Sequence, residues 1–83
     1  MANIRLRFFA AARAAAGIDE TSVTVSSGAT IGDALALFAV DRPDVSDVVS
    51  RCSFLVNGIA ETNPLRPLAD GDLVDVMPPF AGG

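Results

Sequence analysis

The last residues of this sequence offer one reactive group, the C-terminal carboxylate of Gly83. A proline pair at 78–79 restricts the backbone to an extended path, and the two final glycines have no side chains to obstruct a narrow channel. The stretch 78–83 reaches on the order of 20 Å when extended, at ~3.3–3.6 Å per residue. We therefore predict a tail that delivers Gly83 into another protein's active site. The residues predicted to pass through the channel are Phe80, Ala81 and Gly82.

A carboxylate is a poor electrophile at neutral pH and must first be activated, for example as an acyl-adenylate. The sequence has no histidine, lysine, tyrosine or tryptophan, so it lacks the commonest general base and the commonest metal ligand. Ser–His or Cys–His activation is excluded within this chain, and no CxxC, HExxH or glycine-rich phosphate loop is present. We expect a protein that is not itself an enzyme, binds no cofactor or metal, and depends on partner proteins for any catalysis.

Three aspartates and one cysteine are the remaining candidates for chemistry. Asp70 and Asp72 are expected in a solvated turn and Asp75 on a strand face, and no EF-hand-like spacing accompanies them. Cys52 is either a reactive thiol or a small buried hydrophobic residue, and we prefer the second interpretation. A structural role is therefore expected for all four residues.

Length and charge exclude several classes of protein. The 83 residues suffice for one domain, and the net charge of −4 comes with scattered arginines and no lysine. Such a chain has no electrostatic footprint for nucleic acid and no polybasic cluster for a membrane surface. The early apolar run 8–12 ends at Arg13, too short for a signal peptide, and no run approaches the ~20 apolar residues of a membrane span.

Hydrophobic periodicity predicts the elements that position the tail. Strands are expected at 3–9, 21–26 and 73–77, and in a hairpin over 54–60 that turns at Asn57-Gly58. The main helix should begin after Thr30, an N-cap with Asp33 as its capping-box partner, and end at Arg42, which precedes a proline. A helical turn at 10–16 and a shorter helix at 44–51 are also expected.

These elements predict an α+β fold, with a mixed sheet of about five strands and one main helix packed on one face. The domain is expected to span residues 1–78, and residues 79–83 to form the free C-terminal tail. We find no internal repeat and no linker that would divide the chain.

The sheet face away from the helix should display a patch beside the start of the tail. Its predicted apolar members suggest a protein partner, although scattered surface hydrophobic residues are also common. Asp75 is expected to form a solvent-exposed ion pair with Arg5 or Arg7 if the first and last strands are neighbours. The residues predicted to form the partner interface are Phe9, Leu55, Leu73, Met77, Pro78 and Pro79.

Several short motifs, in order along nearly the whole chain, resemble the MoaD/ThiS family of ubiquitin-like sulfur carriers. They are Phe8-Phe9-Ala10 with Ala12-Arg13, Val56-Asn57-Gly58, the stretch 67–72 (PLADGD), and the ending 78–83 (PPFAGG). The resemblance is strongest to members that serve molybdopterin synthase, and it implies a β-grasp fold and a cytoplasmic role in molybdenum cofactor biosynthesis. Family members often have an aromatic residue where Met77 stands, and methionine can fill the same gap.

The resemblance also implies a mechanism and a set of partners. A MoeB-like enzyme would use ATP to adenylate Gly83, and a sulfur donor system would convert the adenylate into a thiocarboxylate. The tail would then enter the molybdopterin synthase large subunit (MoaE-like), where sulfur passes to cyclic pyranopterin monophosphate. A heterotetramer of two small and two large subunits is implied.

Three alternatives remain open at this point. The chain could carry sulfur for thiamine thiazole or cysteine biosynthesis, although the ending 78–83 favours molybdopterin. It could be a ubiquitin-like modifier that is conjugated through its C-terminus to lysines of target proteins. It could also be a plain interaction module in which the tail has no role.

Overall fold

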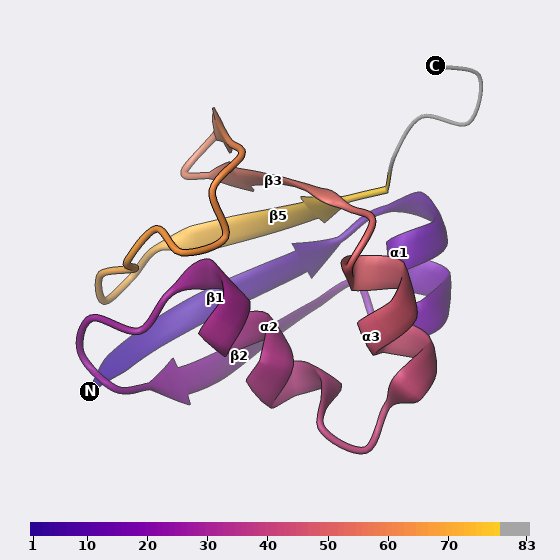
Figure 1. Cartoon of the computed structure of the whole chain (residues 1–83), viewed down its shortest axis with the longest axis horizontal. Helices are drawn as coiled ribbons and strands as arrows, with labels where there is room; N and C mark the ends of the chain where they lie inside the picture. The colour runs from indigo at the N-terminus through magenta and orange to yellow at the C-terminus, as the bar shows by residue number, and fades with distance from the viewer. Residues whose placement is uncertain (79–83) are drawn as a thin grey trace.

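A computed structural model of the chain describes residues 1–78, which form one mixed sheet with helices on one side (Figure 1). The strands are β1 (Ala2–Phe8), β2 (Glu20–Val25), β3 (Ser53–Val56), β4 (Ile59–Glu61) and β5 (Leu73–Met77), in the spatial order β2-β1-β5-β3-β4. β1 and β5 are parallel, whereas the other neighbouring strands are antiparallel. The predicted mixed sheet is confirmed.

The central strands separate a buried face from an outer face. Ile4, Leu6 and Phe8 of β1 point into the core, while the arginines between them point outward. Val74 and Val76 of β5 are completely buried on the same side as these residues. Because side chains alternate along a strand, the residues between them form the opposite face of the sheet.

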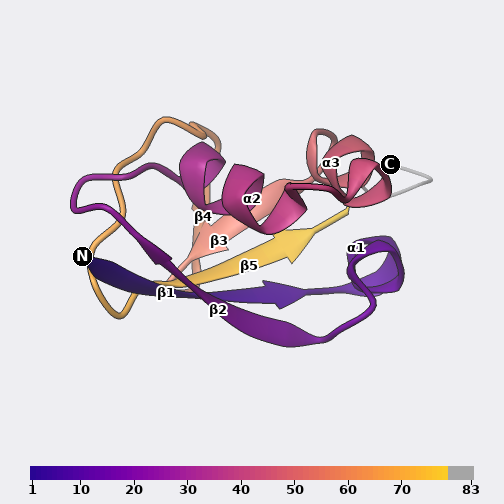
Figure 2. The same cartoon turned by 90° about the horizontal axis from the view of Figure 1, so that it is seen from below.

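The helices are α1 (Ala10–Ala16), α2 (Ile31–Ala39) and α3 (Pro43–Val49). Figure 2 shows α2 and α3 on one face of the sheet, and α1 at the end of β1. The predicted capping box of α2 is confirmed, since Thr30 Oγ1 accepts from the Asp33 N–H and the Asp33 carboxylate accepts from the Thr30 N–H. Gly17 ends α1 with a left-handed backbone, at φ 78°.

Several predicted boundaries differ from the structure by one to three residues, including those of the helix expected at 44–51, which is Pro43–Val49, and two of the differences have identifiable reasons. α2 ends at Ala39 instead of Arg42, because Val40 is extended and Asp41 takes a left-handed conformation with φ 61°. Pro43 then begins α3, where the missing N–H costs no helical hydrogen bond. Phe9 is the N-cap of α1 instead of a strand residue.

The segment after β4 packs against the start of α2 and closes one end of the core. The Ile31 N–H donates to the Arg66 carbonyl at 3.1 Å, and the Gly32 N–H donates to the Pro64 carbonyl at 2.9 Å. These bonds satisfy the first donors of the helix, which have no partner within it. The helices and this loop thus cover the inner face and leave the outer face open to solvent (Figure 2). No helix within residues 1–78 is long and apolar enough to cross a membrane.

Asp72 joins the turn before β5 to the hairpin between β3 and β4. Its carboxylate accepts from the Ala69 N–H at 2.8 Å and from the Asn57 side-chain amide at 2.9 Å. Asn57 in turn accepts from the Leu73 N–H at 3.0 Å. The two hydrogen bonds to the carboxylate hold the pKa of Asp72 below its ordinary value, and the bond from the Ala69 N–H has the larger effect.

This shift predicts part of the acid sensitivity of the domain. The pKa of Asp72 is about 3.9 in the unfolded chain and lower in the folded state. Ionised Asp72 therefore stabilises the fold at pH values above about 3.9, and this stabilisation is lost as the pH falls through the pKa of the folded state. The Asp72→Asn variant should be less stable at neutral pH and lose less stability on acidification below about pH 4. Urea unfolding measured against pH checks this, and parallel curves for the two proteins would contradict it.

Candidate functional site

The predicted tail begins at the end of a strand that is held on both sides. β5 lies between β1 and β3, with Val76 opposite Phe8 in β1 and Met77 opposite Ser53 in β3. Figure 1 shows the C-terminal end of β5 at the same end of the molecule as α1. Two ladders of hydrogen bonds therefore fix the point from which the chain continues into the half-buried Pro78.

The predicted tail, residues 79–83, follows the residues that the structure describes. The roles proposed for these residues stay predictions, because the residues lie outside the part of the chain that the structure describes. They are Pro79, Phe80, Ala81, Gly82 and Gly83.

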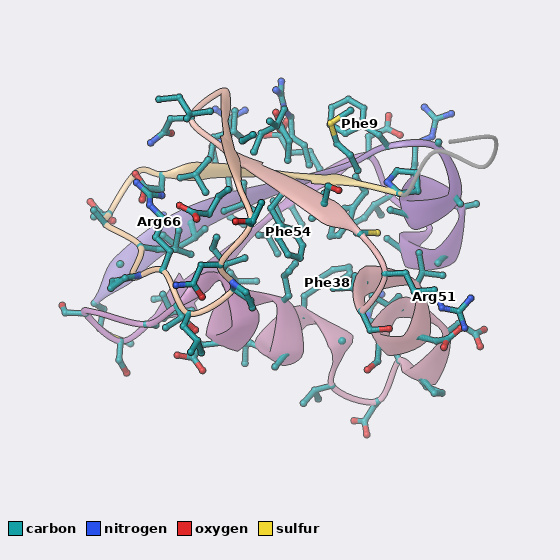
Figure 3. All side chains as sticks on the ribbon, turned by 45° about the horizontal axis from the view of Figure 1, so that its top comes forward. Phe9, Phe38, Arg51, Phe54 and Arg66 are labelled. Atoms are coloured by element: carbon teal, nitrogen blue, oxygen red, sulfur yellow. The ribbon has the colours of Figure 1, made fainter. Side chains whose placement is uncertain are left out.

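Four of the six predicted interface residues lie on the outer face of the sheet. We call them the outer patch: Phe9, Leu55, Leu73 and Met77. Phe9 is 37% exposed and the other three are half-buried. In Figure 3, Phe9 lies on the opposite side of the sheet from Phe54 of β3 and from Phe38, which belongs to α2. The predicted face is therefore confirmed, while its use as an interface stays a prediction.

An ion pair lies within this patch, between neighbouring positions of β1 and β5. Arg7 Nε and Nη2 donate to the two carboxylate oxygens of Asp75 at 2.7 and 3.0 Å. The Asp75 side chain is only 7% exposed, whereas that of Arg7 is 40% exposed. The hydrogen bonds to Asp75 raise the pKa of the Arg7 guanidinium above its ordinary value.

The sequence did not determine whether Asp75 pairs with Arg5 or Arg7. The register between β1 and β5 determines it. Arg7 lies directly opposite Asp75 in the parallel ladder, whereas Arg5 lies opposite Leu73. Arg5 instead binds Glu20 of β2 through its Nε at 2.8 Å. The pair was expected to be exposed, and that expectation is wrong for Asp75. Glu20 was not singled out in the sequence, because its position opposite β1 depends on non-local pairing.

Cys52 fits the structural role that was preferred for it. The residue is half-buried and packs against the core, and its Sγ lies 3.2 Å from the Val48 carbonyl, to which it donates. Burial raises the pKa of the thiol above its ordinary value. Since the thiolate is the nucleophilic form, this shift disfavours a reactive role for Cys52.

The aspartates of the turn before β5 also have structural partners. Asp70 accepts from the Asn3 N–H at 2.6 Å, which ties the turn to the beginning of β1. Within residues 1–78, no three histidine, cysteine, aspartate or glutamate residues lie close enough together to hold a metal ion. The described part of the molecule thus presents a partly exposed apolar patch beside the end of a strand that is paired on both sides.

Comparison with known proteins agrees with this architecture. The ThiS family profile matches residues 6–83. The molybdopterin synthase sulfur carrier subunit of Chlamydomonas reinhardtii is 32% identical over 82 residues, which cover 98% of this chain and 99% of the algal protein. The chain is therefore similar to a sulfur carrier over almost the whole length of both proteins.

Solved structures share the fold. Small archaeal modifier protein 1 of Haloferax volcanii matches with a TM-score of 0.83 and 28% identity, over 96% of this chain and all of the archaeal one. A putative molybdopterin converting factor subunit 1 from Pyrococcus furiosus matches with a TM-score of 0.83 and 25% identity, over 96% and 100% of the two chains. The predicted β-grasp fold is confirmed, and the chain belongs to the ThiS family, within the MoaD/ThiS group of ubiquitin-like sulfur carriers.

Proposed function

We propose that this chain is the sulfur carrier subunit of a molybdopterin synthase, and that Gly83 is the residue that carries the sulfur. The observation that carries the proposal is the near full-length similarity to the algal sulfur carrier subunit. The geometry supports it, because the tail follows a central strand that is held on both sides and begins beside an apolar patch.

The reaction cycle begins with activation of the carboxylate. A MoeB-like enzyme joins the Gly83 carboxylate to AMP, with ATP as substrate and pyrophosphate as leaving group. A sulfur donor system then displaces AMP and leaves a thiocarboxylate on Gly83. The tail enters the large subunit, sulfur passes to cyclic pyranopterin monophosphate, and water restores the carboxylate.

The chain's own contribution is binding and delivery. It has no histidine or lysine to act as a general base, and its only cysteine is held as a thiol. The large subunit and the activating enzyme must therefore supply the catalytic groups. The outer patch gives these partners an apolar surface beside the point where the tail begins. We place this cycle in the cytoplasm, as the family resemblance implies.

The proposal is tested by the intact mass of the protein after purification from cells with an active sulfur system. We expect a fraction whose mass increase equals the replacement of one oxygen by sulfur, located at Gly83 by fragmentation. The control is the same chain without Gly83, expressed in parallel. An unmodified C-terminus in every preparation would contradict the proposal.

A second candidate function is conjugation to other proteins. The similarity to an archaeal modifier protein, which extends over nearly the full length of both chains, favours it. In that case Gly83 would form amide bonds with lysines of target proteins, and adducts with branched glycine remnants would be found in cell extracts.

Incubating thiocarboxylated protein with separate molybdopterin, thiazole and cysteine acceptor systems would distinguish the sulfur pathways by their products.

A further inference from the structure

The Arg7–Asp75 pair is asymmetric in its burial. The carboxylate is enclosed, at 7% exposed, and both of its oxygens are bound by Arg7. The guanidinium is 40% exposed and faces outward from the sheet. The enclosed anion thus fixes the position of a cation that remains accessible on the outer face.

Asp75 uses only some of the hydrogen-bond donors of the Arg7 guanidinium. It carries five N–H donors, of which Asp75 uses one on Nε and one on Nη2. Among the hydrogen bonds formed within residues 1–78, none involves Nη1 of Arg7. Since Nη1 and the second proton of Nη2 form a further fork, Arg7 can bind a second planar acceptor while it remains bound to Asp75.

The position of Arg7 ties this fork to the start of the tail. The Arg7 Cζ lies 5.7 Å from the centroid of the Phe9 ring, an outer-patch residue. The Phe9 N–H donates to the Val76 carbonyl at 3.2 Å, one residue before β5 ends at Met77. A protein that receives the tail at this point would therefore lie next to Arg7.

We propose that Arg7 is a specificity residue of the outer patch, and that its free fork receives a carboxylate side chain from the protein that takes up the tail. The inference rests on the proposed function, because it assumes such a partner. A carboxylate fits because its two oxygens match two parallel N–H donors. A partner without an acceptor would bury these donors unpaired, which is unfavourable and selects against it.

Arg5 is a natural comparison on the same strand and face. Arg5 also donates through Nε and Nη2, in its case to Glu20 toward the edge of the sheet, and the two side chains are 52% and 39% exposed. Any further bond made there is screened by water and contributes little. Arg5→Lys is therefore the matched control for Arg7→Lys, since both substitutions keep the charge and remove the fork.

The test measures binding of the full chain to the molybdopterin synthase large subunit of the same organism by calorimetry. We expect Arg7→Lys to weaken binding roughly tenfold or more, and Arg5→Lys by less than about twofold. Thermal unfolding checks that both variants remain folded. Binding by Arg7→Lys equal to that of the unmodified chain would overturn the inference.

A charge exchange identifies the partner group. Arg7→Glu should bind poorly, and replacing one aspartate or glutamate of the large subunit by lysine should restore its binding. If no such replacement restores it, the acceptor is not a carboxylate and the inference fails. Failure of the unmodified chain to bind the large subunit would instead count against the proposed function.

Discussion

Removal of Gly82 and Gly83 should abolish molybdopterin formation and leave the thermal stability of the domain unchanged. The sheet is complete at Met77, so no strand or core contact of the described residues is lost. The new C-terminal carboxylate would lie about 7 Å short of its former reach, at ~3.3–3.6 Å per residue. Because errors of about 1 Å can lower reaction rates 100-fold, no measurable transfer is expected.

The measurement is product formation in a reconstituted reaction with the activating enzyme, the sulfur donor and the large subunit. The truncated chain should still bind the large subunit through the outer patch, which separates loss of chemistry from loss of docking. Unchanged product formation would show that the tail is not the site and would favour a plain interaction module.

Leu73→Asp should weaken binding to the large subunit by about 100-fold, which makes it the stronger of the two proposed interface variants. Leu73 lies at the end of the outer patch farthest from Met77, directly opposite Arg5, which is already bound to Glu20. A partner that covers this position would bury the new carboxylate in place of an apolar side chain. The folded domain should tolerate the change at a cost of about 1 kcal/mol, because the side chain is only half-buried.

Calorimetry measures the affinity, and Ser22→Asp is the control. Ser22 is exposed on β2 opposite Arg5, so the control adds the same charge to the same face but away from the outer patch. Ser22→Asp should bind nearly as well as the unmodified chain. Tight binding retained by Leu73→Asp would place the interface elsewhere on the molecule.

Local patterns in the sequence were enough to predict most of the fold. Alternation in β1 and β5 gave the correct faces, because a side chain's face depends only on its parity along the strand. The left-handed backbone at Asn57 and Gly58 agrees with the hairpin turn that this dipeptide predicts. The end of α2 was missed because Asp41, which is not a glycine, adopts a left-handed conformation there.

The candidate site was predictable in its composition but not in its pairing. The outer patch could be predicted from the alternation of side chains along each strand. The pairing of Arg7 with Asp75 depends on the register between β1 and β5, which are far apart in the sequence. The burial of Asp75 was also missed, because it depends on neighbours from both adjacent strands. The sequence motif at 78–83 remains the basis for the tail itself.

The central position of β5 has a mechanical consequence for a carrier that must leave its partner after each cycle. A pull on the C-terminus acts along the axis of β5, which is bonded to β1 on one side and to β3 on the other. Such a load shears several hydrogen bonds at once instead of unzipping them one by one, since they run across the strand. The domain should therefore withstand withdrawal from a tight channel without unravelling.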